Sequence, residues 1–255
     1  RSCIAGVSAR SWDVLATRVL KVMKHNLRNN LRDNWAILAV ILAFFFFFFW
    51  RVMFGGRVFL AGDQQVYTWP LRTIAWDMIR HGQLPLWTPY LFSGYPLLSM
   101  AQLGLGYPLT WTYLFLPGHW AEHLVMFAPY VLAPLFTYAY LREVGRSRAA
   151  SLLGGLSFGY GGLMMSGIGL NGMLPNAMMW TPLLLLAVER ARTRPFGRCA
   201  LIVAGAYAMS ILSGIGQGFV YTGLLAAAYA AFMTICWPHT DDEPAPSWRS
   251  KLRWR

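Results

Sequence analysis

Apolar residues gather in long runs along this chain, and shorter, mostly basic segments separate these runs. A helix that crosses a membrane needs about 20 mainly apolar residues. The pattern predicts about six such helices, and the first contains a run of six phenylalanines. The predicted spans are Trp35–Phe54, His119–Leu141, Ala149–Ser166, Leu174–Val188, Cys199–Ser213 and Gln217–Trp237. The sequence therefore predicts an all-α polytopic membrane protein.

Composition agrees with this class. Hydrophobic residues make up 56% of the chain and charged residues only 13%, whereas soluble domains carry about 25% charged residues. The net charge of +12 is spread between the apolar runs. Because it does not gather on one soluble face, it indicates membrane topology and argues against nucleic acid as a partner. The three cysteines form no CxxC pair and predict neither a disulfide framework nor a zinc site.

The basic residues also predict an orientation. With the N-terminus in the cytoplasm, 18 of the 22 Lys and Arg residues fall on the inner side, as the positive-inside rule requires. The chain then divides into a basic cytoplasmic segment 1–33, a transmembrane domain 34–237 and a basic cytoplasmic segment 238–255. Because the chain starts with Arg and stops in "SWRSKLRWR", we expect it to be a piece of a longer protein.

The longest outer connection, residues 55–118, opens with a helix signal. Pro70 suits the first turn of a helix, and Gly82 ends it. Between them Leu71, Ile74, Ala75 and Met78 follow i, i+3, i+4, i+7 spacing, which predicts one apolar stripe. The pattern indicates an amphipathic helix at the membrane surface.

Two arginines, Arg72 and Arg80, lie off this stripe. In one interpretation they only extend towards lipid headgroups. In the other, one of them binds a lipid phosphate.

The rest of the outer connection, Leu84–Pro117, is rich in proline and aromatic residues. Its proline density forbids a continuous helix, yet it is too apolar for a solvated loop. We expect irregular backbone that packs against the spans or dips into the membrane, where protein or a cavity satisfies its polar groups. Trp87, Tyr90, Gln102 and Tyr107 are candidate substrate-binding residues in this segment. Its Trp and Tyr residues equally suit an interfacial aromatic belt.

A single carboxylate, Asp63, stands near the end of the first predicted span. The nearest acidic residues are Asp33 before it and Asp77 after it. One interpretation is a helix-capping or turn residue after Gly62. The other is a catalytic or metal-binding group.

Two familiar motifs are present without the context that would give them function. "HWAEH", His119–His123, matches a metallopeptidase pattern, but the later acids are expected at the inner face, so we interpret it as a wet helix start. "GIGLNG", Gly167–Gly172, matches GxGxxG but joins two apolar helices, without a preceding strand. The pairs Gly155/Gly159 and Gly214/Gly218 have the spacing that favours close helix packing.

Several blocks resemble the YfhO-like family of bacterial polytopic membrane proteins, which is grouped with the GT-C class of lipid-linked glycosyltransferases. They cover about residues 34–237, and the proline-aromatic block is the most specific. The blocks are "GDQQVYTWPLR", "GQLPLWTPYLFSGYPLLSMAQLGLGYPLTWTYLFLP", "MLPNAMMWTPLLLLAVER" and "LSGIGQGFVYTGLLAAAYAAF".

The resemblance implies a GT-C-like fold in the bacterial inner membrane and transfer of a sugar from a polyprenyl-phosphate donor to a cell-envelope acceptor. Membrane lipids and the lipid-linked sugar would be its partners. Asp63 occupies the place of the usual catalytic acid in the first outer loop. It would act as a general base or hold a divalent cation, Mg²⁺ or Mn²⁺, against the donor phosphate. Arg72 or Arg80 would then stabilise the leaving phosphate.

The chain departs from the family at three points. Thr88 replaces an Asn of the tryptophan block, and Gly214-Ile215-Gly216-Gln217 replaces a Gly-His-Pro-Gln block, which removes any histidine role there. GT-C proteins also have more spans than the six expected here. Two rival functions therefore stay open, namely a transporter of lipid or polysaccharide and a non-catalytic membrane subunit of a larger complex. The oligomeric state does not follow from the sequence.

Overall fold

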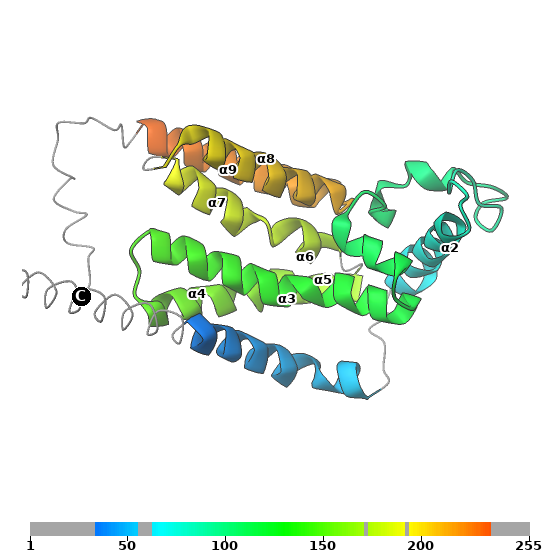
Figure 1. Ribbon diagram of the computed structural model, residues 1–255, viewed down its shortest axis with the longest axis horizontal. Coiled ribbons are helices and arrows are strands. Elements are labelled where there is room, and N and C mark those ends of the chain that lie inside the picture. The colour runs from blue at the N-terminus through cyan, green and yellow to red at the C-terminus, as the bar shows by residue number, and fades with distance from the viewer. Residues whose placement is uncertain (1–33, 56–62, 171–172, 192–193, 236–255) are drawn as a thin grey trace, which may run out of the picture. The chain divides into compact units, whose positions relative to one another are not determined.

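The computed structural model describes residues 34–55, 63–170, 173–191 and 194–235, and Figure 1 shows their arrangement. The basic segments predicted at 1–33 and 238–255 lie outside these residues. The described chain is mostly helical, and no strand occurs in it. After a first apolar helix, Asn34–Phe54, the helices are η1 (Gln64–Thr68), α2 (Trp69–Arg80), η2 (Leu97–Ser99), η3 (Ala101–Leu103), η4 (Pro108–Leu114), α3 (Gly118–Glu143), α4 (Arg148–Gly159), α5 (Gly162–Leu170), α6 (Met173–Met178), α7 (Thr181–Arg190), α8 (Phe196–Leu212) and α9 (Gly216–Ile235).

The chain forms two compact units, Arg1–Phe44 and Phe45–Arg255. Of the first unit the structure describes only the beginning of the first apolar helix. The second unit contains the outer loop and all later helices, and the candidate site lies within it.

Three described helices are long and apolar enough to cross a membrane: the first helix, α3 and α9. Helix α8 is apolar but shorter. These helices support the prediction of a helical membrane protein. The predicted third and fourth spans are each built from two short helices, α4 with α5 and α6 with α7. The count of six spans therefore stays a prediction.

The sequence explains both interruptions. Between α4 and α5 the chain reads Tyr160-Gly161, followed by a further glycine at the start of α5, and glycine weakens a helix interior. In α7, Pro182 lies in the first turn. Because proline has no N–H, it cannot continue the hydrogen-bond ladder of α6, but it suits the start of a new helix.

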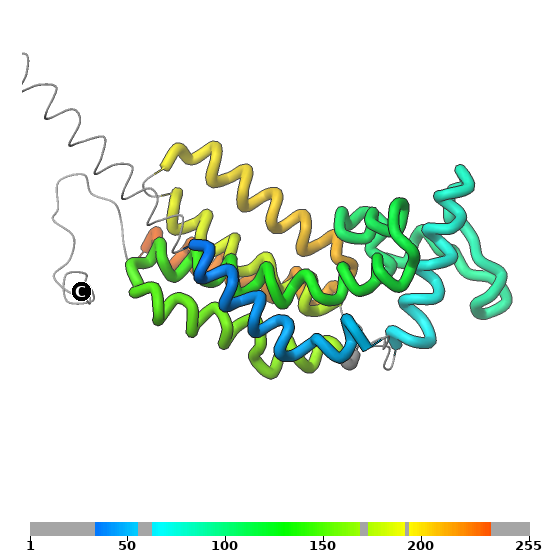
Figure 2. The backbone as a smooth tube through the Cα atoms, turned by 60° about the horizontal axis from the view of Figure 1, so that its bottom comes forward, coloured from blue at the N-terminus to red at the C-terminus, as the bar shows by residue number. Residues whose placement is uncertain are grey.

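Helix α3 lies between α4 and the pair α6–α7, and α8 and α9 pack beyond α7 (Figures 1 and 2). Glycine permits the closest approaches. A Cβ at Gly155 would lie 2.7 Å from the Pro134 carbonyl oxygen of α3, and one at Gly159 would lie 2.4 Å from the Pro134 ring. A Cβ at Gly218 of α9 would lie 2.4 Å from the Ala177 side chain. The close helix packing predicted from the glycine pairs is confirmed for Gly155 and Gly159 and, in the second pair, for Gly218.

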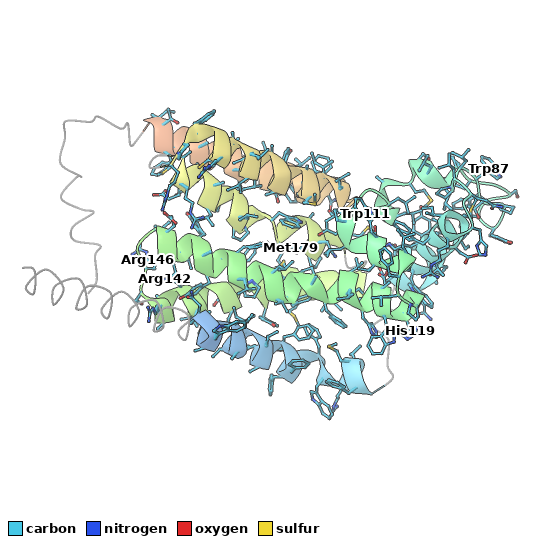
Figure 3. The ribbon with its side chains drawn as sticks, viewed as in Figure 1. Trp87, Trp111, His119, Arg142, Arg146 and Met179 are labelled. Atoms are coloured by element: carbon cyan, nitrogen blue, oxygen red, sulfur yellow. The ribbon has the colours of Figure 1, made fainter. Side chains whose placement is uncertain are left out.

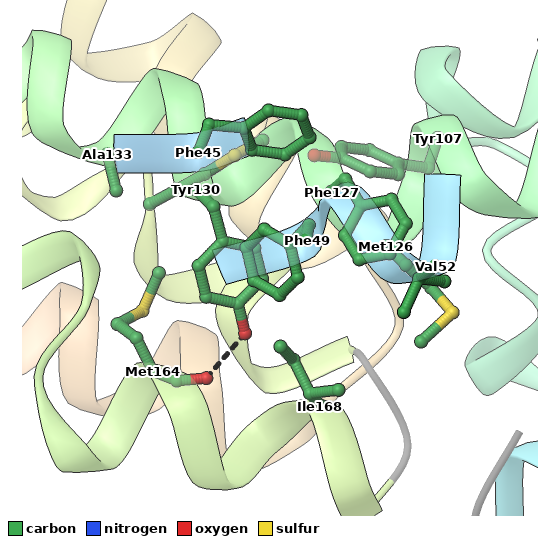
Figure 4. Close-up of a cluster of buried hydrophobic side chains, with 11 residues drawn as sticks. Phe45, Phe49, Val52, Tyr107, Met126, Phe127, Tyr130, Ala133, Met164 and Ile168 are labelled. Carbon is green, nitrogen blue, oxygen red and sulfur yellow. Dashed lines mark hydrogen bonds between the residues drawn. The ribbon is translucent and has the colours of Figure 1, made fainter. Parts of the chain in front are cut away.

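The main core of the second unit is aromatic (Figure 4). Phe45 and Phe49 pack against Phe127, and Phe49 also packs against Tyr130. The buried hydroxyl of Tyr130 donates a hydrogen bond of 2.6 Å to the Met164 carbonyl oxygen. The phenylalanine run therefore anchors its helix to α3 through two of its rings, since a buried hydroxyl needs a partner and the rings supply apolar contact.

The amphipathic helix predicted after Pro70 is confirmed as α2, with Pro70 in its first turn and Gly82 in the left-handed region just after it. Its apolar stripe packs inward. Leu71 and Ala75 form a buried cluster with the proline-aromatic segment through Leu97, Met100 and Leu103. The apolar face of α2 thus packs on the proline-aromatic segment of the same loop.

The proline-aromatic segment has no continuous helix, as predicted. A single antiparallel bridge joins Thr88 to Tyr95, and three short 3₁₀ helices follow. Tyr107 packs in the main core and Tyr113 packs against Trp76 and Ala121. Irregular backbone therefore packs directly on the helices, which is the arrangement that satisfies its polar groups. Whether it dips into a membrane stays a prediction.

Gly214, in the turn between α8 and α9, holds this segment against the helices. Its φ is +91°, and a Cβ there would lie 2.0 Å from the Ala101 carbonyl oxygen. We predict that Gly214→Ala lowers the free energy of unfolding by at least about 1–3 kcal/mol, because both the backbone angle and the contact reject a side chain. Thermal unfolding in detergent, followed by tryptophan fluorescence, measures the loss.

Gly216→Ala is the matched control, because a Cβ at Gly216 meets nothing within 4 Å and the residue is exposed. Equal midpoints for the two variants would contradict the close contact at Gly214.

Candidate functional site

Asp63 lies immediately before η1 and is exposed. Its backbone is helical, with φ −61° and ψ −24°, and its side chain makes no capping hydrogen bond. The capping interpretation therefore has no support in the structure. The carboxylate is open to solvent at the start of the outer loop's first helical segment.

The charge of Asp63 acts on one neighbouring tyrosine, Tyr67. Partial burial, followed by the neighbouring Tyr95 and Asp63, raises the pKa of Tyr67 above its ordinary value. Tyr67 also packs with Tyr95 on the cluster formed by α2 and the proline-aromatic segment. Because a negative charge favours the neutral phenol, Asp63 adds to the effect of burial on the pKa of Tyr67.

The next residue, Gln64, is fully buried. Its side-chain amide donates a hydrogen bond to Glu122 Oε1 in the first turns of α3. The exposed Asp63 is thus adjacent in sequence to a buried residue. The hydrogen bond of Gln64 to Glu122 holds this part of the loop against α3.

Glu122 also forms a buried ion pair with Arg72. Arg72 is 2% exposed and Glu122 0% exposed. One terminal nitrogen of Arg72 lies 2.9 Å from Glu122 Oε1 and 2.8 Å from Oε2. The Tyr113 hydroxyl donates a further hydrogen bond to Oε2. Each carboxylate oxygen therefore has more than one donor, which is the condition for a buried charge to be tolerated.

The guanidinium group of Arg72 is satisfied on its other side by the proline-aromatic segment. Its Nε donates to the Leu103 carbonyl oxygen at 3.0 Å, and its second terminal nitrogen donates to the Gln102 carbonyl oxygen at 3.4 Å. Arg72 therefore joins α2, the proline-aromatic segment and α3 through one planar group.

The electrostatics agree with this arrangement. Burial alone would lower the pKa of Arg72, but the Glu122 carboxylate and Tyr113 raise it above its ordinary value. Burial and the Glu122 charge also raise the pKa of the Tyr113 hydroxyl, so that Tyr113 stays a donor. Arg72 is thus charged, paired and unable to reach a ligand without breaking the pair.

A small polar pocket adjoins the pair, with room for about one water molecule. It is lined by Arg72, Tyr107, Thr110, Glu122, Val125, Met126, Met173, Asn176 and Ser213. A pocket of this size is too small for a sugar ring.

The remaining predicted site residues fall into two groups. Trp87, Tyr90 and Gln102 are exposed, with Tyr90 the most open at 79%. The ring of Trp87 lies against Gly94, where a Cβ would come within 2.2 Å of it. In Figure 3 Trp87 lies on the outer loop, away from the helices that follow it.

The second group forms hydrogen bonds within the protein, where Tyr107 is buried and Arg80 is exposed. Tyr107 is 1% exposed, and its hydroxyl accepts a hydrogen bond of 3.2 Å from Trp180 Nε1. A terminal nitrogen of Arg80 donates to the carbonyl oxygens of Tyr113 and Leu116, the latter at 2.6 Å. Arg72 and Tyr107 therefore share a pocket, whereas Asp63, Trp87, Tyr90 and Gln102 are on the surface.

The burial of Glu122 was not expected from the sequence. The "HWAEH" stretch suggested a wet helix start, but Glu122 is fully buried and His123 is 7% exposed, so this interpretation is wrong. His119 and Trp120 of this stretch are exposed. The usable signal was an unpaired acid within the first turns of a predicted span, because such an acid needs a buried partner.

The described residues do not supply a ready metal site. They contain no group of three His, Cys, Asp or Glu side chains placed to share an ion. Asp63 is a single oxygen ligand, so a divalent cation held there would need donor phosphate oxygens and water as its other ligands. The general-base role needs Asp63 alone.

Comparison with protein-family models, with curated proteins and with solved structures finds no match to this chain. Function must therefore be argued from the residues and their geometry.

We predict that Glu122→Ala lowers the free energy of unfolding by about 3–5 kcal/mol, because it leaves the Arg72 guanidinium buried without its counter-charge. Replacing both partners by apolar residues, as Arg72→Met with Glu122→Leu, should recover much of that loss. Denaturant titration in mixed micelles measures both values.

The matched control is Glu143→Ala. It breaks the pair between Arg190 Nε and Glu143 Oε2, which is also 2.8 Å long but partly exposed, and should cost less than about 1 kcal/mol. Similar losses at Glu122 and Glu143 would show that burial does not strengthen the pair.

Proposed function

We propose that this chain is the part of a membrane glycosyltransferase that carries its catalytic carboxylate, acting on a polyprenyl-phosphate-linked sugar at the outer face of the bacterial inner membrane. The observation that carries the proposal is Asp63, an exposed and uncapped carboxylate at the start of the outer loop. The resemblance of the surrounding blocks to YfhO-like proteins supports the same reaction.

Asp63 is the general base. Its carboxylate takes the proton from an acceptor hydroxyl as the hydroxyl oxygen bonds to the anomeric carbon of the donor sugar. The bond between that carbon and the phosphate oxygen breaks, and the electron pair leaves with polyprenyl phosphate. An exposed carboxylate suits this step because an acceptor hydroxyl can reach it.

The other predicted residues receive different roles. Trp87 and Tyr90 offer exposed aromatic faces on which sugar rings can pack. Arg72 is a positioning residue, since its guanidinium is committed to Glu122 and to two carbonyl oxygens. Arg80 is partly exposed and holds the loop through the Tyr113 and Leu116 carbonyl oxygens, which leaves it nearer than Arg72 to a phosphate outside.

Transport of a lipid-linked sugar is the second candidate, and one observation favours it. Helix pairs α4–α5 and α6–α7 are interrupted. Transporters place substrate sites at such interruptions, because the free backbone groups there can bind a ligand.

We predict that Asp63→Asn lowers the rate of sugar transfer by the full-length protein about 100-fold or more, because the amide cannot accept the proton. Transfer of radiolabelled sugar from a polyprenyl-phosphate donor to extracted envelope acceptor measures the rate. Asp77→Asn is the control, since Asp77 is also exposed, on the following helix, and should keep the wild-type rate.

Two outcomes would overturn the assignment. Undiminished transfer by Asp63→Asn would remove the catalytic role. Proteoliposomes in which the protein moves labelled lipid-linked sugar across the bilayer, without forming a glycosidic bond, would establish the transporter.

A further inference from the structure

Two histidines, His119 and His123, lie four residues apart at the start of α3. Side chains at positions i and i+4 share one face of a helix, with about 5–6 Å between their Cβ atoms. Both imidazole rings contact the same indole, that of Trp120, at centroid distances of 5.4 Å and 5.8 Å. In Figure 3 His119 lies at the end of α3 that adjoins the outer loop. The two imidazoles therefore belong to one patch of the helix surface.

His123 is buried without hydrogen bonds. It is 7% exposed, yet neither its Nδ1 nor its Nε2 has a hydrogen-bond partner within the part of the chain that the structure describes. Aromatic rings flank it, with Trp120 edge-on and the centroid of Phe127 at 5.6 Å. A neutral imidazole carries one N–H donor and one acceptor nitrogen, and burying both without a partner is costly. A ligand that binds a ring nitrogen would remove part of this cost.

The side chains beside His123 leave room for such a ligand to enter. His119 is exposed, and Trp120 is 45% exposed. Exposed side chains change rotamer within nanoseconds. Because both imidazoles contact the indole of Trp120, its rotation opens a space that both of them border.

We propose that His119 and His123 together bind one divalent transition-metal ion. Imidazole nitrogen suits Zn²⁺, Cu²⁺ and Ni²⁺, and two histidines at i and i+4 on one helix face are a known way to hold such an ion. Water fills the other coordination positions, because the described residues place no third His, Cys, Asp or Glu beside the pair. The bound ion satisfies a nitrogen of the buried His123.

The residue between the two ligands sets this site apart from a peptidase centre. Glu122 would be the base of such a centre, but it is fully buried. Its carboxylate accepts hydrogen bonds from Gln64, Arg72 and Tyr113. Glu122 is therefore not available to activate a water on the ion. The ion stabilises the start of α3, independently of Asp63 and of sugar transfer.

The test is a titration of the full chain in detergent with Cu²⁺, the divalent ion that nitrogen ligands bind most tightly. Electron paramagnetic resonance counts the bound imidazoles through the nitrogen hyperfine pattern. The wild type should hold one Cu²⁺ with two imidazole nitrogens. His119→Gln should weaken that binding about tenfold or more and leave one imidazole on the ion, because one ligand is lost. Since His119 is exposed, the variant should unfold at the wild-type temperature without metal.

His81→Gln is the matched control. His81 is exposed at the end of α2, where its Nδ1 lies 2.8 Å from the Asp77 carbonyl oxygen, and its loss should leave the two-imidazole signal unchanged. The double variant His119→Gln/His123→Gln measures the background from the other histidines. Should His123→Gln fail to fold, His119→Gln alone decides. A wild-type signal with fewer than two imidazoles would overturn the proposal. So would an unchanged signal in His119→Gln, or an equal loss in His81→Gln.

Discussion

The ion pair between Arg72 and Glu122 holds the long loop, residues 55–118, against α3. Both side chains are buried, and desolvating two charges is costly unless every polar group finds a partner. Here the partners come from separate segments. The outer-loop helices supply Gln64 and Arg72, and the proline-aromatic segment supplies two carbonyl oxygens and the Tyr113 hydroxyl. A loop of this length and proline content gains a fixed shape because these groups can satisfy one another only in one arrangement.

Within the outer loop, the residues that hold the fold together are buried, whereas the candidate site residue Asp63 is exposed. The first two described residues of the loop differ in exposure, since Gln64 is buried in the network and Asp63 is exposed. Arg72 is committed to the network, which leaves the exposed face of the loop with an acid and several aromatic rings. The water-sized pocket beside Glu122 is consistent with this division.

The opposite end of α3 is organised by a different rule. There the charges are mostly arginines, and the acids among them are consumed by internal bonds. The end of α3 next to the loop thus buries paired charges, whereas the opposite end carries more arginines than acids. Both arrangements follow from cost: a paired charge can be buried when fully hydrogen-bonded, but excess charge has to remain where water or lipid headgroups neutralise it.

The sequence by itself determined the class of the protein and much of its local structure. Apolar runs of about 20 residues indicated helices that cross a membrane. Pro70 and Gly82 bounded α2, and the glycine pairs marked where helices touch. These features follow from periodicity and from the backbone chemistry of single residues. Only the tertiary structure decided which charges meet, because Arg72 and Glu122 lie 50 residues apart and neither has a local partner. It also decided that the predicted third and fourth spans are broken helices. Hydropathy is an average over a window of residues. A helix, in contrast, is interrupted at single positions where a glycine or a proline disrupts its backbone hydrogen bonds.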